Sequence, residues 1–123
     1  MCGISAVYRY TAITDEDVSR VERMNDQMRY RGPDGEGYWH DEHCAMGQVR
    51  LSIIGLQNGK QPIYNHDKSL VLVCNGEIYN YRELRKVVAA KGYECATDSD
   101  CEVILYLYEI YGLDCVNHLR GMF

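Results

Sequence analysis

Cys2, in the opening stretch MCGISAVY, is a residue that could do covalent chemistry. If Met1 is removed, Cys2 carries both a thiol nucleophile and a free α-amine, and such an amine titrates at about 7.7–8.0 in model peptides. The two groups together can supply attack and proton transfer. Taken alone, a cysteine at a strand start is more often a buried small apolar residue. Other residues must decide between the two interpretations.

Three further polar features stand where local structure would present them to a ligand. Arg50 lies within the otherwise apolar run VRLSIIG. It is either an exposed charge at a strand edge or a planar guanidinium that binds a carboxylate. Asn75 and Gly76 follow SLVLVC, either as a hairpin turn or as donors of an oxyanion hole. Asp100 is either a first-turn acid that serves a helix or a fixed carboxylate. Together they could hold a free amino acid while its side-chain carbonyl is attacked.

The composition is that of one globular domain that buries a core. The chain has 123 residues, of which 46% are hydrophobic and 25% charged. A formal net charge of -5, with charges mixed along the chain, argues against nucleic-acid or anionic-membrane partners. The apolar runs fall far short of the roughly 18 residues of a spanning helix, and the N-terminus lacks a signal-peptide pattern. We therefore expect a cytoplasmic protein that acts on a small molecule.

The cysteines and histidines predict neither disulfides nor a metal centre. Without a secretory signal, the six cysteines are expected to be reduced thiols. The stretch HDEHC at residues 40–44 has ligand-type side chains, but it lacks a second ligand pair at zinc-site spacing. We therefore predict no metal site.

The first elements expected to position these groups are a strand and a helix. CGISAVYRY shows the period-two alternation of a half-buried strand. Its apolar face would carry Ile4, Ala6, Tyr8 and Tyr10. Thr14, followed by three acidic residues, predicts a helix start, because a hydroxyl caps the first turn and the helix dipole favours negative charge there. The helix stripe would comprise Val18, Val21, Met24 and Met28, before RGPDGEG ends the helix.

Strands and two more helices are predicted in the remainder of the chain. One strand pair is expected through residues 38–39 and 45–54, and a hairpin through residues 63–65 and 70–74 around NHDKS. Asn80 with Glu83 has the spacing of a helix start, and Ser99 with Glu102 is predicted to be a capping box that opens a helix. The buried positions would be Leu84, Val87 and Val88 before Gly92, and Val103, Ile104, Leu107 and Tyr111 before Gly112.

Hairpin-like spacings imply antiparallel pairing, so the chain is predicted to be α+β rather than a doubly wound parallel sheet. The sequence ends on Met122 and Phe123 just after a glycine, where an apolar strand is expected to begin. We therefore expect the domain to be incomplete at its C-terminus.

Six ordered motifs resemble the N-terminal glutaminase domain of class II glutamine amidotransferases, of the asparagine synthetase (glutamine-hydrolysing) type. They are MCGISAVY, RYRGPDGEG, VRLSIIGL, KQPIYN, CNGEIYNYRELR and SDCEVILYLYEIYG. The resemblance covers essentially the whole chain and implies an N-terminal-nucleophile hydrolase fold, an αββα sandwich. Residues 1–123 would then form an incomplete glutaminase domain, which in this family is normally followed by an ATP-using synthetase domain.

The resemblance also implies a role for each matching residue. Cys2 resembles the nucleophile freed by removal of Met1, and Arg50 matches the arginine that binds the α-carboxylate of glutamine. Asn75 and Gly76 match the oxyanion hole. Glu77 would add to the glutamine site, and Asp100 matches the carboxylate that holds the α-ammonium. The pocket around the side chain would be lined by Leu51, Ser52, Ile53 and Ile54. The implied reaction is attack on the side-chain amide, loss of ammonia to leave a thioester, and hydrolysis to glutamate.

The implied partners are glutamine and a C-terminal synthetase domain that passes the ammonia to aspartate. No cofactor is expected in residues 1–123, since ATP and Mg would belong to the synthetase domain, and a homodimer is retained among the expected assemblies. Two alternatives stay open: an amidotransferase that serves another acceptor, and a non-catalytic fragment that only binds glutamine. The thiol of Cys2 favours catalysis, because a pure binder would not need it.

Overall fold

The computed structural model describes residues 2–123 and divides into two compact units. Unit 1 comprises the chain up to Ser52 together with Lys60–Pro62 and Val73–Asn75. Unit 2 comprises Ile53–Gly59, Ile63–Leu72 and Gly76–Phe123. Met1 lies outside the described residues, so its removal stays a prediction.

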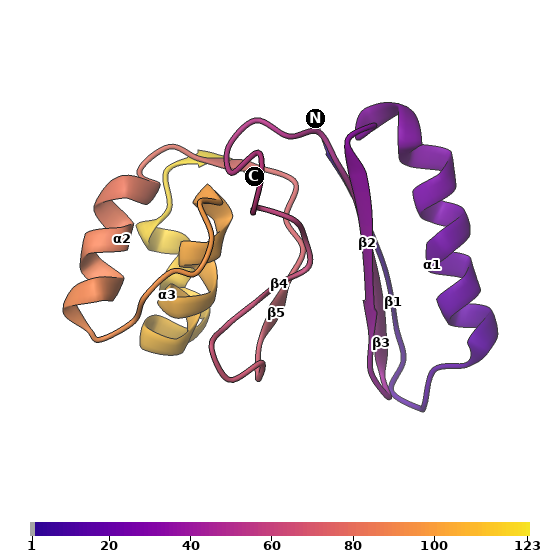
Figure 1. Cartoon of the computed structure of the whole chain (residues 1–123). Helices are drawn as coiled ribbons and strands as arrows, with labels where there is room; N and C mark the ends of the chain where they lie inside the picture. Colours follow the sequence, from indigo (N-terminus) through magenta and orange to yellow (C-terminus); the bar gives the residue numbers. More distant parts are fainter. Residues whose placement is uncertain (1) are drawn as a thin grey trace. The chain divides into compact units, whose positions relative to one another are not determined.

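Unit 1 is a three-stranded antiparallel sheet with one helix along one face (Figure 1). Its elements are β1 (Gly3–Tyr8), α1 (Asp15–Met28), a 3-10 turn (Arg29–Arg31), β2 (Gly35–His40) and β3 (Cys44–Arg50). The strand order is β1-β3-β2, so β3 is central and pairs with both neighbours. The end of β3, where Arg50 lies, is therefore held from two sides.

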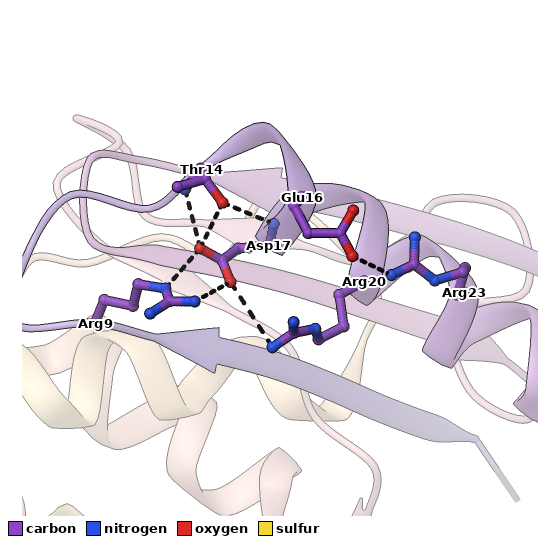
Figure 2. Close-up of polar contacts among 6 residues, drawn as sticks. All are labelled: Arg9, Thr14, Glu16, Asp17, Arg20 and Arg23. Atoms are coloured by element: carbon purple, nitrogen blue, oxygen red, sulfur yellow. Dashed lines mark hydrogen bonds and ion pairs between the residues drawn. The ribbon is translucent and has the colours of Figure 1, made fainter.

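The helix α1 begins where the sequence predicts, at a Thr14 cap (Figure 2). The Thr14 hydroxyl accepts from the Asp17 N–H at 3.3 Å, and the Asp17 carboxylate accepts from the Thr14 N–H at 3.0 Å. Arg9 donates to both oxygens of Asp17, at 2.6 and 2.8 Å. The Asp17 side chain is fully buried, and the hydrogen bonds from Arg9 hold its pKa well below the usual range. The capping prediction is confirmed, and the structure adds an ion pair between the half-exposed Arg9 and the buried Asp17 carboxylate.

The face of the sheet that packs on α1 is not the one predicted. Asn25 of α1 is fully buried, accepts from the Ser5 hydroxyl at 2.8 Å and donates to the Gln48 carbonyl at 3.3 Å. A Cβ at Gly47 would lie only 2.8 Å from the Asn25 amide, so the helix requires small and polar residues beneath it. The prediction that the apolar face of β1 is buried is wrong. Its residues are all exposed: Ile4, Ala6, Tyr8 and Tyr10.

Unit 2 contains two short strand pairs and two packed helices (Figure 1). Its elements are β4 (Ile63–Tyr64), β5 (Val71–Leu72), β6 (Glu77–Ile78), α2 (Tyr81–Ala90), a 3-10 turn (Asp100–Glu102), α3 (Val103–Tyr111), a 3-10 helix (Gly112–His118) and β7 (Gly121–Met122). The core is contributed mainly by Leu84, Val88, Val103, Leu105, Tyr106 and Leu107. The helix positions agree with the sequence prediction, although Val87 is 38% exposed.

The predicted α+β class with antiparallel pairing is confirmed, since every named strand pair in residues 2–123 is antiparallel. The hairpin of residues 63–65 and 70–74 is also confirmed, shortened to β4 and β5. The hairpin interpretation of Asn75 and Gly76 is wrong, because β6 pairs with β7 and not with β5. Those two residues are therefore left in a connection between strands.

Two predicted details fail because a side chain finds another partner. The strand predicted through residue 54 ends at Arg50, and the next backbone N–H, that of Leu51, donates to a sulfur instead of a neighbouring strand. Ser99 caps the turn by accepting from the Cys101 N–H, but Glu102 does not complete the capping box. Its buried carboxylate accepts from the N–H groups of Ala96 and Thr97, each at 2.7 Å.

Candidate active site

The thiol of Cys2 lies against the backbone just past the end of β3. The Leu51 N–H donates to Sγ at 3.3 Å, and Sγ lies 3.6 Å from the Leu51 carbonyl oxygen, to which the thiol donates. Arg31 donates to the Cys2 carbonyl oxygen at 3.1 Å. The thiol is thus fixed from one side and its backbone from another, although 49 residues separate it from Leu51. Cys2 is half-buried, which suits a nucleophile that a substrate must reach.

Arg50 is buried, with 8% of its surface exposed, and the glycine-rich loop after α1 packs on its backbone. A Cβ at Gly32 would overlap the backbone of Val49 and Arg50, so only glycine fits there. The Asp34 N–H donates to the Arg50 carbonyl at 2.9 Å, and the Asp34 carboxylate accepts from the Ser52 N–H at 2.7 Å. The loop therefore holds the residues on both sides of Leu51.

Asn75 closes unit 1 and is half-buried. The residue before it, Cys74, is bound on both backbone groups by one side chain, that of Gln61. Unit 1 thus contains the predicted nucleophile Cys2, the predicted carboxylate-binding Arg50 and one predicted oxyanion donor, Asn75.

Unit 2 contains the two predicted carboxylates. Asp100 is 4% exposed, and its Oδ2 accepts from the Ile78 N–H at 2.6 Å. Burial, together with the neighbouring Asp100 charge, raises the pKa of Glu77 above its ordinary value. Two carboxylates that repel each other form an environment that an ammonium group would neutralise. Gly76, the first residue of this segment, has its carbonyl 3.7 Å from the Cys101 thiol.

The predicted pocket-lining residues divide between the units. Leu51 and Ser52 belong to unit 1, whereas Ile53 and Ile54 belong to unit 2. Residues 53–59 are fixed within unit 2 by a hydrogen bond of 3.0 Å from the Asp98 N–H to the Asn58 side chain. The structure thus groups the predicted residues into two sets, one in each unit.

Sequence reasoning did not single out the residues that hold the backbone of these groups. Arg31 lies in RYRGPDGEG and Gln61 lies in KQPIYN, but neither motif predicts the partner of these side chains. The spacing of Glu102 from Ser99 predicts a partner that it does not bind. A long amide side chain between a lysine and a proline does not specify that Gln61 binds a residue 13 positions further along the chain.

The described residues show neither a metal cluster nor a membrane helix. Among residues 2–123, no group of three or more His, Cys, Asp or Glu side chains is arranged to hold a metal ion. No helix in this part of the chain is long and apolar enough to cross a membrane. The six cysteines, all within it, carry thiols rather than disulfides.

Comparison with known proteins identifies the family. The sequence profile described as "Glutamine amidotransferase domain" matches residues 1–123, which is the whole chain. The chain belongs to this family of glutamine amidotransferase domains. The thiol at Cys2 and the ordered motifs therefore occur in a recognised glutamine amidotransferase domain, and the resemblance seen in the sequence is confirmed.

This glutamine amidotransferase domain is similar to the N-terminal parts of much longer proteins. It is 46% identical to asparagine synthetase [glutamine-hydrolyzing] 1 of Bacillus subtilis (strain 168), a match that covers all of this chain and 20% of that protein. It is 45% identical to asparagine synthetase [glutamine-hydrolyzing] of Zea mays and 42% identical to asparagine synthetase [glutamine-hydrolyzing] 1 of Arabidopsis thaliana, with 21% of each covered. The chain spans about a fifth of the length of the curated relatives it matches.

Proposed function

We propose that this domain hydrolyses the side-chain amide of glutamine to glutamate and ammonia, with Cys2 as the nucleophile. Family membership and the names of the relatives, which describe glutamine-hydrolysing enzymes, support this function. The observation that carries the mechanism is the placement of the Cys2 thiol on the Leu51 backbone, one residue from the buried Arg50.

In the first step, the thiolate of Cys2 attacks the carbonyl carbon of the glutamine side chain. A carbon–sulfur bond forms, and the carbonyl electron pair moves onto oxygen. The Asn75 side-chain amide and the Gly76 N–H donate hydrogen bonds to that oxyanion, and such donors act without having to lose a proton. The thiol proton passes to the α-amine of Cys2, which is free once Met1 has been removed.

In the second step, the carbon–nitrogen bond breaks and the α-ammonium returns its proton to the leaving nitrogen. Ammonia departs and a thioester joins Cys2 to the glutamyl group. Water then attacks the thioester, gives up a proton to the α-amine, and releases glutamate while the thiol is restored. A base whose pKa lies near the working pH serves both directions of transfer.

Substrate recognition is proposed to use the opposite charges of a free amino acid. Arg50 binds the α-carboxylate through two parallel hydrogen bonds, which its planar guanidinium suits better than an ammonium would. Asp100, with Glu77, holds the α-ammonium. Leu51, Ser52, Ile53 and Ile54 line the pocket around the side chain.

The finer architecture and the wider reaction are also proposals. The helix on one face of an antiparallel sheet in unit 1 is compatible with half of an αββα sandwich, and we propose that this is an N-terminal-nucleophile hydrolase fold. We further propose that residues 1–123 act as the glutaminase domain of a longer protein in which a synthetase domain transfers the ammonia to aspartate. Labelled amide nitrogen should then appear in asparagine when the full-length protein receives glutamine, aspartate and ATP.

Replacing the nucleophile tests the proposed hydrolysis. Cys2→Ala should abolish glutamate and ammonia release with an unchanged circular dichroism spectrum, because no other group can form the thioester. Cys44→Ala, at another half-buried free cysteine, is the matched control and should stay within about twofold of the parent protein. Turnover retained by Cys2→Ala would overturn the mechanism. Glutamine bound without hydrolysis by the parent protein would instead show a non-catalytic binding module.

A further inference from the structure

The side chain of Gln61 binds both backbone groups of Cys74, the residue that precedes Asn75. Its Nε2 donates to the Cys74 carbonyl oxygen at 3.1 Å, and its Oε1 accepts from the Cys74 N–H at 2.6 Å. One primary amide thus satisfies a donor and an acceptor of a single residue, as a neighbouring strand would. Both bonds lie within unit 1.

The backbone at Cys74 lies beyond the end of the strand. β5 ends at Leu72, and residues 73–75 belong to no strand or helix. Without Gln61, the partly buried N–H and C=O of Cys74 would each lose this hydrogen bond, and the φ and ψ angles next to Asn75 would be less restrained. The Gln61 side chain therefore replaces the ladder hydrogen bonds that a longer strand would have supplied.

Gln61 is itself held on the sheet that carries the nucleophile. A Cβ at Gly37 would overlap the Gln61 carbonyl oxygen and would lie 2.8 Å from Cδ of Pro62, so the two segments are in direct backbone contact. Gly37 of β2 pairs with Gln48 of β3, two residues before Arg50. A continuous series of contacts therefore connects the end of β3 with the backbone beside Asn75.

We propose that Gln61 is a positioning residue that aims the Asn75 amide at the oxyanion formed on the substrate. This inference rests on the proposed function, since it requires Asn75 to be an oxyanion donor. The hydrogen bonds of the Gln61 side chain go to the Cys74 backbone, and in this account Gln61 does not bind the substrate. Its effect is therefore on the transition state, where the donor must be placed within a few tenths of an ångström, and only weakly on glutamine binding.

The first variant removes both hydrogen bonds with little change of side-chain length. Gln61→Met in the full-length protein should lower kcat for glutamine hydrolysis by about ten- to a hundredfold, less than the loss expected when an oxyanion donor itself is removed. KM for glutamine should change by less than about threefold. Gln27→Met is the matched control, because Gln27 is exposed on α1 of the same unit, and it should leave both constants unchanged.

A transition-state mimic separates positioning from general loosening of the fold. The aldehyde analogue of glutamine adds the Cys2 sulfur to its carbonyl, so the resulting tetrahedral oxygen uses the oxyanion donors. A diazo-ketone analogue instead alkylates the sulfur with loss of dinitrogen and depends less on them. Gln61→Met should lose about tenfold or more in affinity for the aldehyde while its alkylation rate stays within about threefold.

A second variant can form both hydrogen bonds to Cys74 only when its side chain is protonated. In Gln61→Glu, the ionised carboxylate accepts from the Cys74 N–H but cannot donate to the Cys74 carbonyl, whereas the protonated acid can do both. The kcat of Gln61→Glu relative to the parent protein should therefore rise as the pH falls from 8 towards about 5, near the pKa of a glutamic acid.

The outcomes distinguish failure of the proposed role of Gln61 from failure of the proposed glutamine hydrolysis. If the parent protein neither hydrolyses glutamine nor binds the aldehyde, the proposed function fails. If the parent does both, and Gln61→Met keeps its kcat or loses aldehyde binding and alkylation equally, then Gln61 is not a positioning residue. A flat pH ratio for Gln61→Glu would also overturn the inference.

Discussion

The backbone N–H of Ile78 donates a hydrogen bond of 2.6 Å to Oδ2 of Asp100. One oxygen of this buried carboxylate is thereby committed to holding the strand that follows Gly76. In the proposed site, the negative charge of Asp100 also attracts the α-ammonium of glutamine. The same side chain thus has a structural task and a binding task, and two substitutions can separate them.

Asp100→Asn keeps an oxygen that accepts from Ile78 but removes the charge. We expect the fold to be retained and KM for glutamine to rise about tenfold or more, because an ion pair with the ammonium is lost. Asp100→Ala removes both, and should also lower the free energy of unfolding by about 1–3 kcal/mol, since the Ile78 N–H is left unpaired. Steady-state kinetics and urea unfolding measure the two effects. Asp98→Asn, at an exposed position of the same loop, is the control.

In the proposed site, Glu77 should make glutamine binding dependent on pH. Burial and the Asp100 charge raise its pKa, so it becomes neutral at a higher pH than an ordinary glutamic acid. As the pH falls through that raised pKa, the attraction for the ammonium weakens and KM should increase. Glu77→Gln should have a raised KM at neutral pH and should lose this acidic limb of the profile. An unchanged limb in Glu77→Gln, with the exposed Glu83→Gln as the comparison, would refute the assignment.

Two glycines of β2 give a matched test of the packing around Gln61. A Cβ at Gly37 would overlap the Gln61 carbonyl oxygen, whereas a Cβ at Gly35 would meet no atom within 4 Å. Gly37→Ala should therefore cost about 1–3 kcal/mol of unfolding free energy and lower kcat, and Gly35→Ala should do neither. Urea midpoints of both variants provide the measurement. Equal midpoints would mean that the close contact does not restrain these segments.

Asp17 makes the stability of unit 1 sensitive to acid. Hydrogen bonds from Arg9 hold its pKa below the ordinary carboxyl value of 3.8, so the folded state binds its proton less readily than the unfolded state. This stabilisation is complete above pH 3.8 and should be lost as the pH falls through the lowered pKa. Asp17→Asn should unfold at lower urea at neutral pH and show a flatter acid profile. Glu16→Gln removes the exposed pair with Arg23 and should change little.

Local sequence signals predicted the elements well where the partner lay close in the chain. Thr14 caps α1 as its place before three acidic residues indicates, and Gly112 ends α3 with a positive φ of 58°. The signal failed where another group competed. Glu102 has the right spacing from Ser99, but its carboxylate accepts from the Ala96 and Thr97 N–H groups of the preceding loop instead.

The packed face of β1 could not be predicted from hydrophobic alternation. The apolar Ile4 and Tyr8 are exposed, and Ser5 is buried because its hydroxyl donates to Asn25, a polar residue on the buried face of α1. A buried polar pair between a strand and a helix leaves no periodic apolar signal. Only the three-dimensional pairing shows that the helix lies over the polar side.

The predicted site residues came from the residue types and from the motif resemblance, and the contacts that hold them came from the structure. Cys2 and Leu51 are 49 residues apart, and no sequence pattern indicates that the thiol meets that particular peptide. The partner of Gln61 has no sequence signal for the same reason. Its function depends on a pair of hydrogen bonds to Cys74 that exist only once the chain has folded.

The most direct test of the central claim is mass spectrometry of the protein after treatment with the diazo-ketone analogue of glutamine. We predict that Met1 is absent and that a single adduct is carried by Cys2, with glutamine protecting against labelling and Cys2→Ala giving none. An adduct on any of the other five cysteines with Cys2 unmodified, or an intact Met1 in a protein that hydrolyses glutamine, would contradict the account.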